Sequence, residues 1–367
     1  MADSTSHDPL AAALRWIERG RSVALATVVG TWGSSPRPVG SQLCVTDRRE
    51  LAGSVSGGCV EGAVVEEAQH VLADGSSRVL DYGVTNEDAW AVGLACGGQV
   101  RIHVGPVSPA LLTALLEAVD AKRMVVLATD LSDGRQALFF PLDPHAEPVA
   151  DEGAGAVGAA DGARLAADEV VLTAAEAAAR ADASTLAQDS GGREVFLRVY
   201  GPPHRLVVVG AVHIAQPLAR MAAELGLDVV VVDPRRAFAS EERFPGVALV
   251  REWPVEALEA LAPDHRTAVV TLSHDPKLDD PALEAALASP AFYVGALGSR
   301  RTHAARVERL TEAGVSAEAL ERLHAPVGLD IGARTPAEVA VAVLAEVVVA
   351  LRRHRPGGAG EGRGRGR

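Results

Sequence analysis

The feature that most constrains this chain is an apolar segment that stops at a glycine and is followed by a helical pattern and a second apolar segment. The first spans residues 205–215 (Arg-Leu-Val-Val-Val-Gly-Ala-Val-His-Ile-Ala), and the second spans residues 229–235 (Val-Val-Val-Val-Asp-Pro-Arg). A strand, a helix and a parallel strand in this order form the opening βαβ unit of a dinucleotide-binding fold. The pattern predicts that fold and places Asp233 where a ribose hydroxyl is bound.

The glycine turn departs from the dinucleotide fingerprint at one position. Where the third residue of the turn is a glycine in that fingerprint, this chain has Val212. A β-branched side chain hinders the close approach of the backbone to a pyrophosphate, which glycine permits. The segment therefore supports the fold more strongly than it supports binding of NAD(P).

The composition limits the class of protein. With 367 residues, of which 48% are hydrophobic and 23% charged, the chain can form two or three domains with substantial cores. A formal net charge of −13 argues against binding of nucleic acid, and no apolar stretch reaches the ~18 residues that span a bilayer. The first residues do not resemble a secretory signal, and three cysteines are too few for a disulfide framework or a zinc site. We expect a cytoplasmic protein that does not associate with membranes.

The order of elements predicts two α/β domains and a tail. The amino-terminal domain covers residues 8–200, in which the Ala- and Gly-rich stretch 146–167 is expected to be a mobile excursion outside the core. In residues 204–353 strands alternate with helices, as is typical of a Rossmann-like, doubly wound parallel sheet. Thr335 opens a capping box with proline at the first helical position, so the last helix is expected to begin there. The Gly/Arg-rich residues 356–367 are expected to be disordered.

Ligands of an open parallel sheet bind at the carboxyl ends of its strands, where helix amino termini and backbone donors converge. Four loops of the second domain are expected there, at residues 210–213, 273–280, 295–303 and 328–335. Glycines together with arginines at helix starts suit an anionic ligand, most simply a phosphate. The candidate binding residues are Gly210, His213, Asp233, His274, Asp275, Gly298, Ser299, Arg300, Arg301, Asp330 and Arg334.

Alternatives stay open for several of these residues. The arginines could be solvated or could pair with nearby acids, and His213 could cap its helix instead of binding a phosphate or a base. Trp32 and Trp90 could stack on a planar ring, although packing in the core is the expected role. The chain contains no Gly-x-Ser-x-Gly elbow and no Gly-x-x-x-x-Gly-Lys-[Ser/Thr] loop, which argues against the hydrolase and kinase classes.

The amino-terminal domain has two cysteines next to paired glycines, Cys59 (Gly-Gly-Cys) and Cys96 (Cys-Gly-Gly). Such glycines remove steric cover, so a large ligand can approach the sulfur. Cys59 also lies near a helix start, where the helix dipole favours a thiolate. A soft sulfur of this kind suits a soft metal or sulfur transfer, whereas the alternative is that each cysteine is a small buried hydrophobe. In the loop 33–40, Arg37 and the neighbouring hydroxyls could hold an anion, or the loop could be an ordinary tight connection.

Several strings of this chain resemble the XdhC/CoxI family. In the amino-terminal half they are Gly-Ser-Ser-Pro-Arg-Pro-Val-Gly (33–40), Gly-Ser-Val-Ser-Gly-Gly-Cys-Val-Glu (53–61) and Gly-Leu-Ala-Cys-Gly-Gly (93–98). In the carboxy-terminal half they are Val-Gly-Ala-Val-His-Ile-Ala-Gln-Pro-Leu-Ala (209–219), Ser-His-Asp-Pro-Lys-Leu-Asp-Asp-Pro (273–281), Gly-Ala-Leu-Gly-Ser-Arg-Arg-Thr-His (295–303) and Gly-Leu-Asp-Ile-Gly-Ala-Arg-Thr-Pro (328–336). They occur in the family's order, so the resemblance covers nearly the whole chain.

The resemblance implies a cargo and partners. Members of the family are accessory proteins of xanthine dehydrogenase and related molybdenum hydroxylases. They bind the molybdenum cofactor, protect it while a cysteine desulfurase replaces an oxo ligand by sulfur, and pass it to the apo-enzyme. By this resemblance the arginine-bearing helix starts would hold the phosphate of molybdopterin or of its cytidine dinucleotide form, and Cys59, followed by Cys96, would lie near the molybdenum. A homodimer without turnover of its own is expected.

Two other functions remain open. One is an NAD(P)-dependent oxidoreductase, which rests on the βαβ unit and Asp233. Val212 and the lack of a Tyr-x-x-x-Lys motif count against it. The other is a sulfurtransferase in which Cys59 carries a persulfide. Val212 also departs from the Gly-Ala-Gly-His turn usual in the family, which directs attention to the other loops as the place where a phosphate is held.

Overall fold

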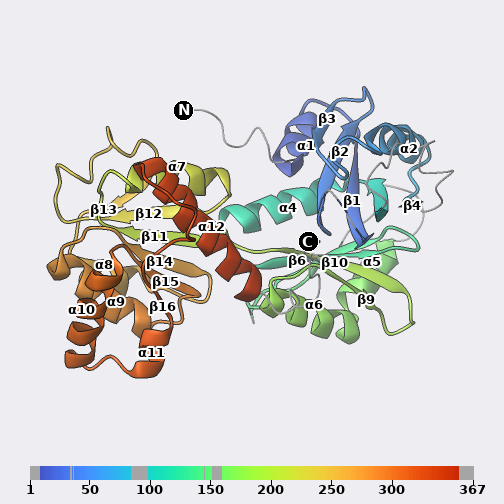
Figure 1. Ribbon diagram of the computed structural model, residues 1–367. Helices are drawn as coiled ribbons and strands as arrows, with labels where there is room; N and C mark the ends of the chain where they lie inside the picture. The colour runs from blue at the N-terminus through green and yellow to red at the C-terminus, as the bar shows by residue number, and fades with distance from the viewer. Residues whose placement is uncertain are drawn as a thin grey trace. The chain divides into compact units, whose positions relative to one another are not determined.

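The computed structural model describes residues 9–33, 35, 37–83, 98–143, 145–150 and 159–354. The chain divides into two units, residues 1–202 and 203–367. Within the described residues, the first unit contains two five-stranded sheets and the second a six-stranded sheet (Figure 1). Of the helices in these ranges, none is both long and apolar enough to cross a membrane.

The first sheet of unit 1 is antiparallel and has the order β3-β2-β1-β5-β4. Its elements are α1 (Pro9–Glu18), β1 (Val23–Trp32), β2 (Gln42–Thr46), β3 (Leu51–Gly53), α2 (Glu61–Asp74), β4 (Arg78–Tyr82) and β5 (Gln99–Pro106). The central strand β1 is buried along nearly all of its length. Helix α2 covers one face, because its Val64, Ala68 and Val71 recur at helical spacing and are fully buried against the strands.

The second sheet of unit 1 is also antiparallel and has the order β8-β7-β6-β10-β9. Its elements are α4 (Pro109–Asp120), β6 (Val125–Asp130), β7 (Gln136–Phe139), β8 (Val149–Ala150), α5 (Ala159–Ala166), α6 (Glu169–Ala181), β9 (Thr185–Gln188) and β10 (Glu194–Tyr200). Helix α6 begins at a side-chain cap, since Asp168 accepts from the backbone N–H of Val170 (3.0 Å). Its Val171 and Ala175 are buried against the sheet.

The stretch 146–167 contains part of the core, which corrects the expectation of a mobile excursion. Strand β8 and helix α5 lie within it, and Leu165 of α5 is fully buried in the same hydrophobic cluster as Phe139 and Val171. Residues 151–158 lie outside the described part of the chain. Composition misled the prediction, because an alanine-rich segment suits a helix as well as a linker.

The sheet of unit 2 has the order β13-β12-β11-β14-β15-β16, and all of its strand pairs are parallel. Its strands are β11 (Arg205–Val209), β12 (Asp228–Val232), β13 (Ala248–Val250), β14 (Thr267–Thr271), β15 (Tyr293–Ala296) and β16 (Leu323–His324). The helices are α7 (Ala215–Glu224), α8 (Pro254–Leu261), α9 (Pro276–Ala288), α10 (Arg300–Glu312), α11 (Ala317–Glu321) and α12 (Pro336–His354). The predicted Rossmann-like, doubly wound sheet is therefore confirmed. Residues 356–367, expected as a disordered tail, lie outside the described residues.

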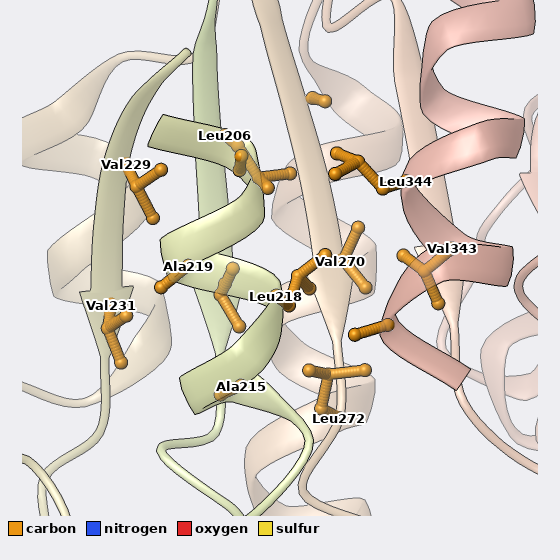
Figure 2. Packing of buried hydrophobic residues seen from close by; sticks show 14 of the residues in the cluster. Leu206, Ala215, Leu218, Ala219, Val229, Val231, Val270, Leu272, Val343 and Leu344 are labelled. Carbon is orange, nitrogen blue, oxygen red and sulfur yellow. The ribbon is translucent and has the colours of Figure 1, made fainter. Parts of the chain in front are cut away.

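Helices cover both faces of this sheet (Figure 1). On one face Leu206, Val231 and Val270 from three strands pack against Leu218 of α7 and Val343 of α12 (Figure 2). Alternate residues of the same strands point to the other face and pack against α8, α9 and α10. Strands buried on both faces require continuous apolar runs, which explains why the sequence pattern was so clear here.

The predicted start of the last helix is confirmed. Helix α12 begins at Pro336; the N–H of Glu338 donates to Thr335 Oγ1 (3.3 Å), and the N–H of Thr335 donates to the Glu338 carboxylate (3.0 Å). We expect Thr335→Ala to lower the free energy of unfolding by about 1 kcal/mol, because it removes the cap acceptor. Urea denaturation measures this change. The control is Thr311→Ala inside α10, where the hydroxyl bonds only the preceding turn; equal losses in both variants would contradict a capping role.

Candidate functional site

The sheet of unit 2 has the topology that creates a ligand-binding edge. From the central pair β11 and β14 the chain builds the sheet outward in opposite directions, so the loops after these two strands diverge. Open α/β sheets bind their ligands at that point. Gly210 follows β11 with a φ of 101°, and a Cβ there would lie 2.8 Å from the backbone nitrogen of Ser273. Glycine is required at this position by both the backbone conformation and the close packing of the two loops.

Asp233, predicted to bind a ribose hydroxyl, accepts hydrogen bonds from its own chain. Its carboxylate is fully buried; it accepts from the N–H of Ala211 (2.8 Å), and the Arg235 guanidinium donates to both oxygens (2.8 and 2.7 Å). Although burial raises it, these hydrogen bonds hold the pKa of Asp233 below its usual value. Asp233 therefore ties the glycine turn to β12, and a ribose would have to displace Arg235 to reach it.

His213 lies exposed in the glycine turn, at the start of α7. Its ring makes no hydrogen bond within the described ranges, so it does not cap the helix as one alternative proposed. Val212 is partly buried against the hydrophobic core of the sheet, which gives this departure from the fingerprint a packing role. The turn thus offers an exposed imidazole beside Gly210, whereas its β-branched residue faces the core.

One buried acid holds the loop after β14. Asp279 accepts hydrogen bonds from the hydroxyl of Ser273 (2.6 Å) and the N–H of His274 (3.1 Å). Burial outweighs these bonds and raises the pKa of Asp279. Asp275 caps α9 by accepting from the N–H of Lys277 (3.0 Å), so its carboxylate has a structural task. His274 is exposed and has a φ of 61°, which residues other than glycine rarely adopt.

The loop after β15 passes over a buried arginine. Ser299 caps α10 by accepting from the N–H of Thr302 (3.2 Å), and Gly298 before it has a φ of 155°. A Cβ on Gly298 would lie 3.3 Å from Thr302 Cβ and 3.7 Å from Nη1 of Arg306. The absence of a side chain at residue 298 therefore keeps the guanidinium close to the surface of the loop.

Arg306 is only 2% exposed, yet its guanidinium is not fully bonded. Nη2 donates to the carbonyl of Leu297 (3.0 Å), whereas Nε and Nη1 are buried without a hydrogen-bond partner among the described residues. The carboxylates of Asp279 and Asp280 are 3.7 and 3.9 Å away, and burial lowers the pKa of Arg306. The hydroxyl of Thr271, at the end of β14, is also buried and unbonded in the same part of the chain. Buried donors of this kind are satisfied in proteins by water or a ligand, and a guanidinium suits an anion.

Three further arginines lie on this edge but at its surface. Arg300 and Arg301 are the first residues of α10, and Arg334 lies just before α12. All three are exposed, as is Asp330, and none of the three arginines forms an ion pair with another described residue. They are solvated, so the alternative in which they pair with nearby acids is not seen. The structure brings them to one edge of the sheet with Arg306, which the sequence analysis did not single out.

In unit 1, Cys59 lies in a loop organised by Glu61, the first residue of α2. The carboxylate of Glu61 accepts from the hydroxyl of Ser54 (2.7 Å), the N–H of Ser56 (2.9 Å) and the N–H of Gly58 (2.8 Å), and it also bonds the hydroxyl of Ser56. Although burial raises it, the hydrogen bonds from Ser56 and Ser54 lower the pKa of Glu61 to about 2. Cys59 is half-buried and packs partly against the core of the first sheet.

The two glycines before Cys59 have positive φ values, and the space beside the second is open. Gly57 and Gly58 have φ values of 75° and 117°, and a Cβ on Gly58 would meet nothing within 4 Å. The space beside the loop is therefore open, as an approaching ligand requires. Cys96 lies outside the described residues, as does Trp90. Among those that are described, no three His, Cys, Asp or Glu side chains gather as a metal site.

The structure also shows where Trp32 and Arg37, two further residues considered in the sequence analysis, lie in unit 1. Trp32 is 50% exposed, so its expected place in the core is wrong; it lies at the end of β1, with its ring against Gly30. Arg37 is exposed at the rim of a cavity within unit 1.

Arg306 and Glu61 are the residues that sequence reasoning missed. A signal existed for the first, because Arg306 stands four residues before the buried Leu310 on the face of α10 that packs inward. An arginine on such a face has a partner or a ligand. For Glu61 the signal was a carboxylate at the first position of a helix after a Ser- and Gly-rich loop, where it can accept from several backbone N–H groups.

Comparisons with known proteins agree with this architecture. A family model for the XdhC Rossmann domain matches residues 206–347, and a model for the XdhC and CoxI family matches residues 16–83. A protein of Escherichia coli (strain K12) named molybdenum cofactor insertion chaperone PaoD is 30% identical over 337 residues, which cover 92% of this chain and 85% of that protein. A protein of Bacillus subtilis (strain 168), named as a probable subunit of xanthine dehydrogenase, is 25% identical over 342 residues, covering 92% and 96% of the two chains.

A solved structure supports the fold. A crystal structure described as a xanthine dehydrogenase from Bacillus halodurans matches with a TM-score of 0.73, covering 96% of this chain and 98% of that chain. The two sequences are 22% identical, so this likeness bears on the fold alone.

Proposed function

Because this chain belongs to the XdhC and CoxI family, we propose that it is a molybdenum cofactor insertion chaperone for an enzyme of the xanthine dehydrogenase type. The family assignment and the name of the 30% identical relative support this role. The cargo is a metal-bearing pterin with a phosphate group. A protein that carries it needs an anion site for the phosphate and protection for the metal.

The observation that carries the proposal is the unsatisfied guanidinium of Arg306 under Gly298. Nη1 and Nε of Arg306 and the hydroxyl of Thr271 are buried and make no hydrogen bond to a described residue, although Nε lies 3.9 Å from the Asp280 carboxylate. They lie at the carboxyl edge of a parallel sheet, where helix α10 also directs its amino terminus. Exposed Arg300 and Arg301 add positive charge at the same helix start. This donor set fits a phosphate or pyrophosphate group of the cargo.

Cys59 is the residue we assign to the metal end of the cargo. Its loop is held by Glu61, the space beside the neighbouring Gly58 is open, and Cys59 itself is only half-buried. When bound, the molybdenum would supply a soft metal centre that accepts a thiol ligand. The role of the protein is to hold the phosphate, orient the pterin and cover the metal. Cys96 remains a second candidate for the same contact.

The proposal also covers the partners of the protein, its oligomeric state and its location in the cell. We propose a molybdenum hydroxylase as client, a cysteine desulfurase that acts on the bound cargo, a cytoplasmic location and a homodimer. The cargo is the pterin or its cytidine dinucleotide form. A nicotinamide dinucleotide fits less well, because Asp233, which would accept a hydrogen bond from its ribose, already accepts two from Arg235.

The test is a comparison of affinities followed by a transfer assay. Purified protein is titrated with molybdenum cofactor released from a molybdenum enzyme, and separately with NADH and NADPH. We expect binding of the cofactor and its transfer to a molybdenum-free xanthine dehydrogenase, measured as regained activity. Cys59→Ser should reduce retention of the metal form more than that of the metal-free pterin. Cys44→Ser is the matched control, because Cys44 is fully buried inside β2.

Three results would contradict the proposal. Tight binding of a nicotinamide dinucleotide with none of the pterin would favour an oxidoreductase. Equal retention of metal-bearing and metal-free pterin in the wild type and in Cys59→Ser would remove Cys59 from the site. A mass increase of one sulfur atom on Cys59 during incubation with a cysteine desulfurase, without retention of the pterin, would favour a sulfurtransferase.

A further inference from the structure

Unit 1 contains a cavity of about 320 Å³ between its two sheets. Its walls come from the chain segments before β2 and after β3, from α1 and α4, and from β10. Its polar lining consists of Arg37, Ser41, Gln42, Arg198 and Tyr200, together with Ser54, and none of the described residues that line it is acidic. In a chain with a formal net charge of −13, two arginines without a carboxylate make the described lining of this cavity positive, which favours a negative ligand.

Arg198 is held in place at the wall of this cavity. Its Nη1 donates to Ser184 Oγ (3.1 Å) and to the carbonyl of Val199 (2.9 Å), and its guanidinium carbon lies 4.7 Å from the centre of the Tyr200 ring. Nε is buried and has no hydrogen-bond partner among the described residues. Gly40 has a φ of 87°, and a Cβ there would lie 3.0 Å from the guanidinium. Because Nε has almost no exposed surface, the donor that the guanidinium can offer a ligand is Nη2, which makes no hydrogen bond to a described residue. A preorganised guanidinium of this kind binds phosphate or carboxylate with little loss of side-chain entropy.

The electrostatics and the size of the cavity define the ligand. Arg37 is exposed at the rim and, like Arg198, forms no ion pair with a described residue. Both guanidinium groups are therefore available to attract an anion in the cavity. Leu10, Leu116 and Val119 provide an apolar wall. Ligand pockets span about 300–1,000 Å³, so this one suits a compact molecule.

We propose that this cavity binds a small organic anion, namely a phosphate or carboxylate group on a compact apolar body. The arginines take the charged group, and the leucines and Val119 cover the apolar body. The inference goes beyond the chaperone role and does not depend on it, because the cavity's arginines, Arg37 and Arg198, take no part in the cargo contacts proposed above. Ser54 connects the cavity to Cys59, since its hydroxyl donates to Glu61 (2.7 Å) and accepts from the N–H of Gly57 (2.9 Å). A bound anion therefore stabilises the Cys59 loop.

The test uses the full chain and simple probes. Isothermal titration calorimetry is run with phenyl phosphate, benzoate, inorganic phosphate and phenol. We expect the two organic anions to bind, inorganic phosphate to bind more weakly and phenol not to bind. Arg198→Gln should weaken phenyl phosphate binding roughly 10- to 100-fold, as expected for a lost hydrogen bond between charged groups. Arg37→Gln, at an exposed rim position, should weaken it by a smaller factor without affecting folding.

Controls locate the site. Arg180→Gln removes an exposed arginine of α6 in the same unit and should leave binding unchanged. Hydrogen–deuterium exchange with phenyl phosphate should slow in the peptides that contain residues 37–42 and 54–60. Slowing confined to residues 297–306 would overturn the proposal, and so would phenol binding as tightly as phenyl phosphate. Affinity that is unchanged in both Arg37→Gln and Arg198→Gln would also overturn it.

Discussion

Replacing Arg306 by methionine is expected to weaken binding of the molybdenum cofactor by about 10- to 100-fold, the loss that corresponds to a charged hydrogen bond. Methionine fills a similar volume but offers no donor, so a phosphate on the Gly298 loop would lose its hydrogen bond to Nη1 of Arg306, the guanidinium nitrogen closest to Gly298. The result is read from titration of the protein with the cofactor. Because the guanidinium is 2% exposed, water cannot replace it easily.

The same variant also affects stability, and a second substitution separates the two effects. Arg306→Met leaves the buried Asp279 without its cation and the carbonyl of Leu297 without its donor, which should lower the free energy of unfolding by about 3 kcal/mol. Burial already raises the pKa of Asp279, so its charged form is disfavoured and an amide is tolerated there. The double variant Arg306→Met, Asp279→Asn should regain much of the stability and none of the binding.

Arg309→Met is the matched control on the same helix. Arg309 lies about one turn after Arg306 on α10 and is partly exposed. It donates two hydrogen bonds to the carboxylate of Asp280. Its loss should reduce stability by about 1 kcal/mol or less and leave cofactor affinity unchanged. If the double variant regained binding together with stability, Arg306 would be a structural residue and the anion site would have to be sought among the exposed arginines.

The parallel sheet could be predicted from sequence because its strands are short apolar runs that alternate with helices along the chain. Residues 206–209 and 229–232 are valine-rich strands that are buried on both faces. The first of them is followed by a turn in which residue 210 must be glycine. The cap at Thr335 was readable for the same reason, since two side chains three residues apart determine it. In the stretch 146–167 the sequence offers few large apolar residues, so the burial of Leu165 depends on contacts with distant strands and could not be read locally.

The site was only half predictable for a similar reason. Loops at the sheet edge follow from topology, so Gly210, Gly298 and Ser299 could be placed there from sequence. Which charged groups are free, however, depends on partners that are remote in sequence or that compete locally. Asp233 is bonded to Ala211, twenty-two residues before it, as well as to Arg235, and Arg306 lies under a loop that begins nine residues earlier. Sequence spacing identifies candidates, whereas the pairing of charges decides among them.

Replacing Glu61 by alanine is the second change with a large expected effect. Four hydrogen bonds from Ser54, Ser56 and Gly58 end on this one carboxylate, so its removal leaves the loop around Cys59 without its anchor. We expect a loss of about 2–3 kcal/mol in the free energy of unfolding, as for other partly buried charged hydrogen bonds. Alkylation of Cys59, followed by mass spectrometry of its peptide, should become roughly tenfold faster, because the loop opens more often.

Glu66→Ala is the control for this experiment. Glu66 lies on the same helix, is exposed and pairs only with the exposed Arg49 among the described residues. Its removal should leave the free energy of unfolding nearly unchanged, because solvent screens an exposed pair, and should leave the alkylation of Cys59 as it is. Equal alkylation rates in Glu61→Ala and wild type would mean that the loop is held by the core packing of Cys59 and not by the carboxylate.

The pKa of Glu61 gives the same prediction a pH dependence. Its folded pKa of about 2 lies below the ordinary value of 4.5, so the carboxylate stabilises the fold fully above pH 4.5 and loses this effect as the pH falls towards 2. After allowance for screening at a partly exposed group, the contribution is about 1–2 kcal/mol. Wild-type stability should therefore fall between pH 4.5 and 2 more steeply than that of Glu61→Ala, and the difference between the two curves should shrink by the same amount. Parallel curves across this range would show that the carboxylate is not bound by the loop in solution.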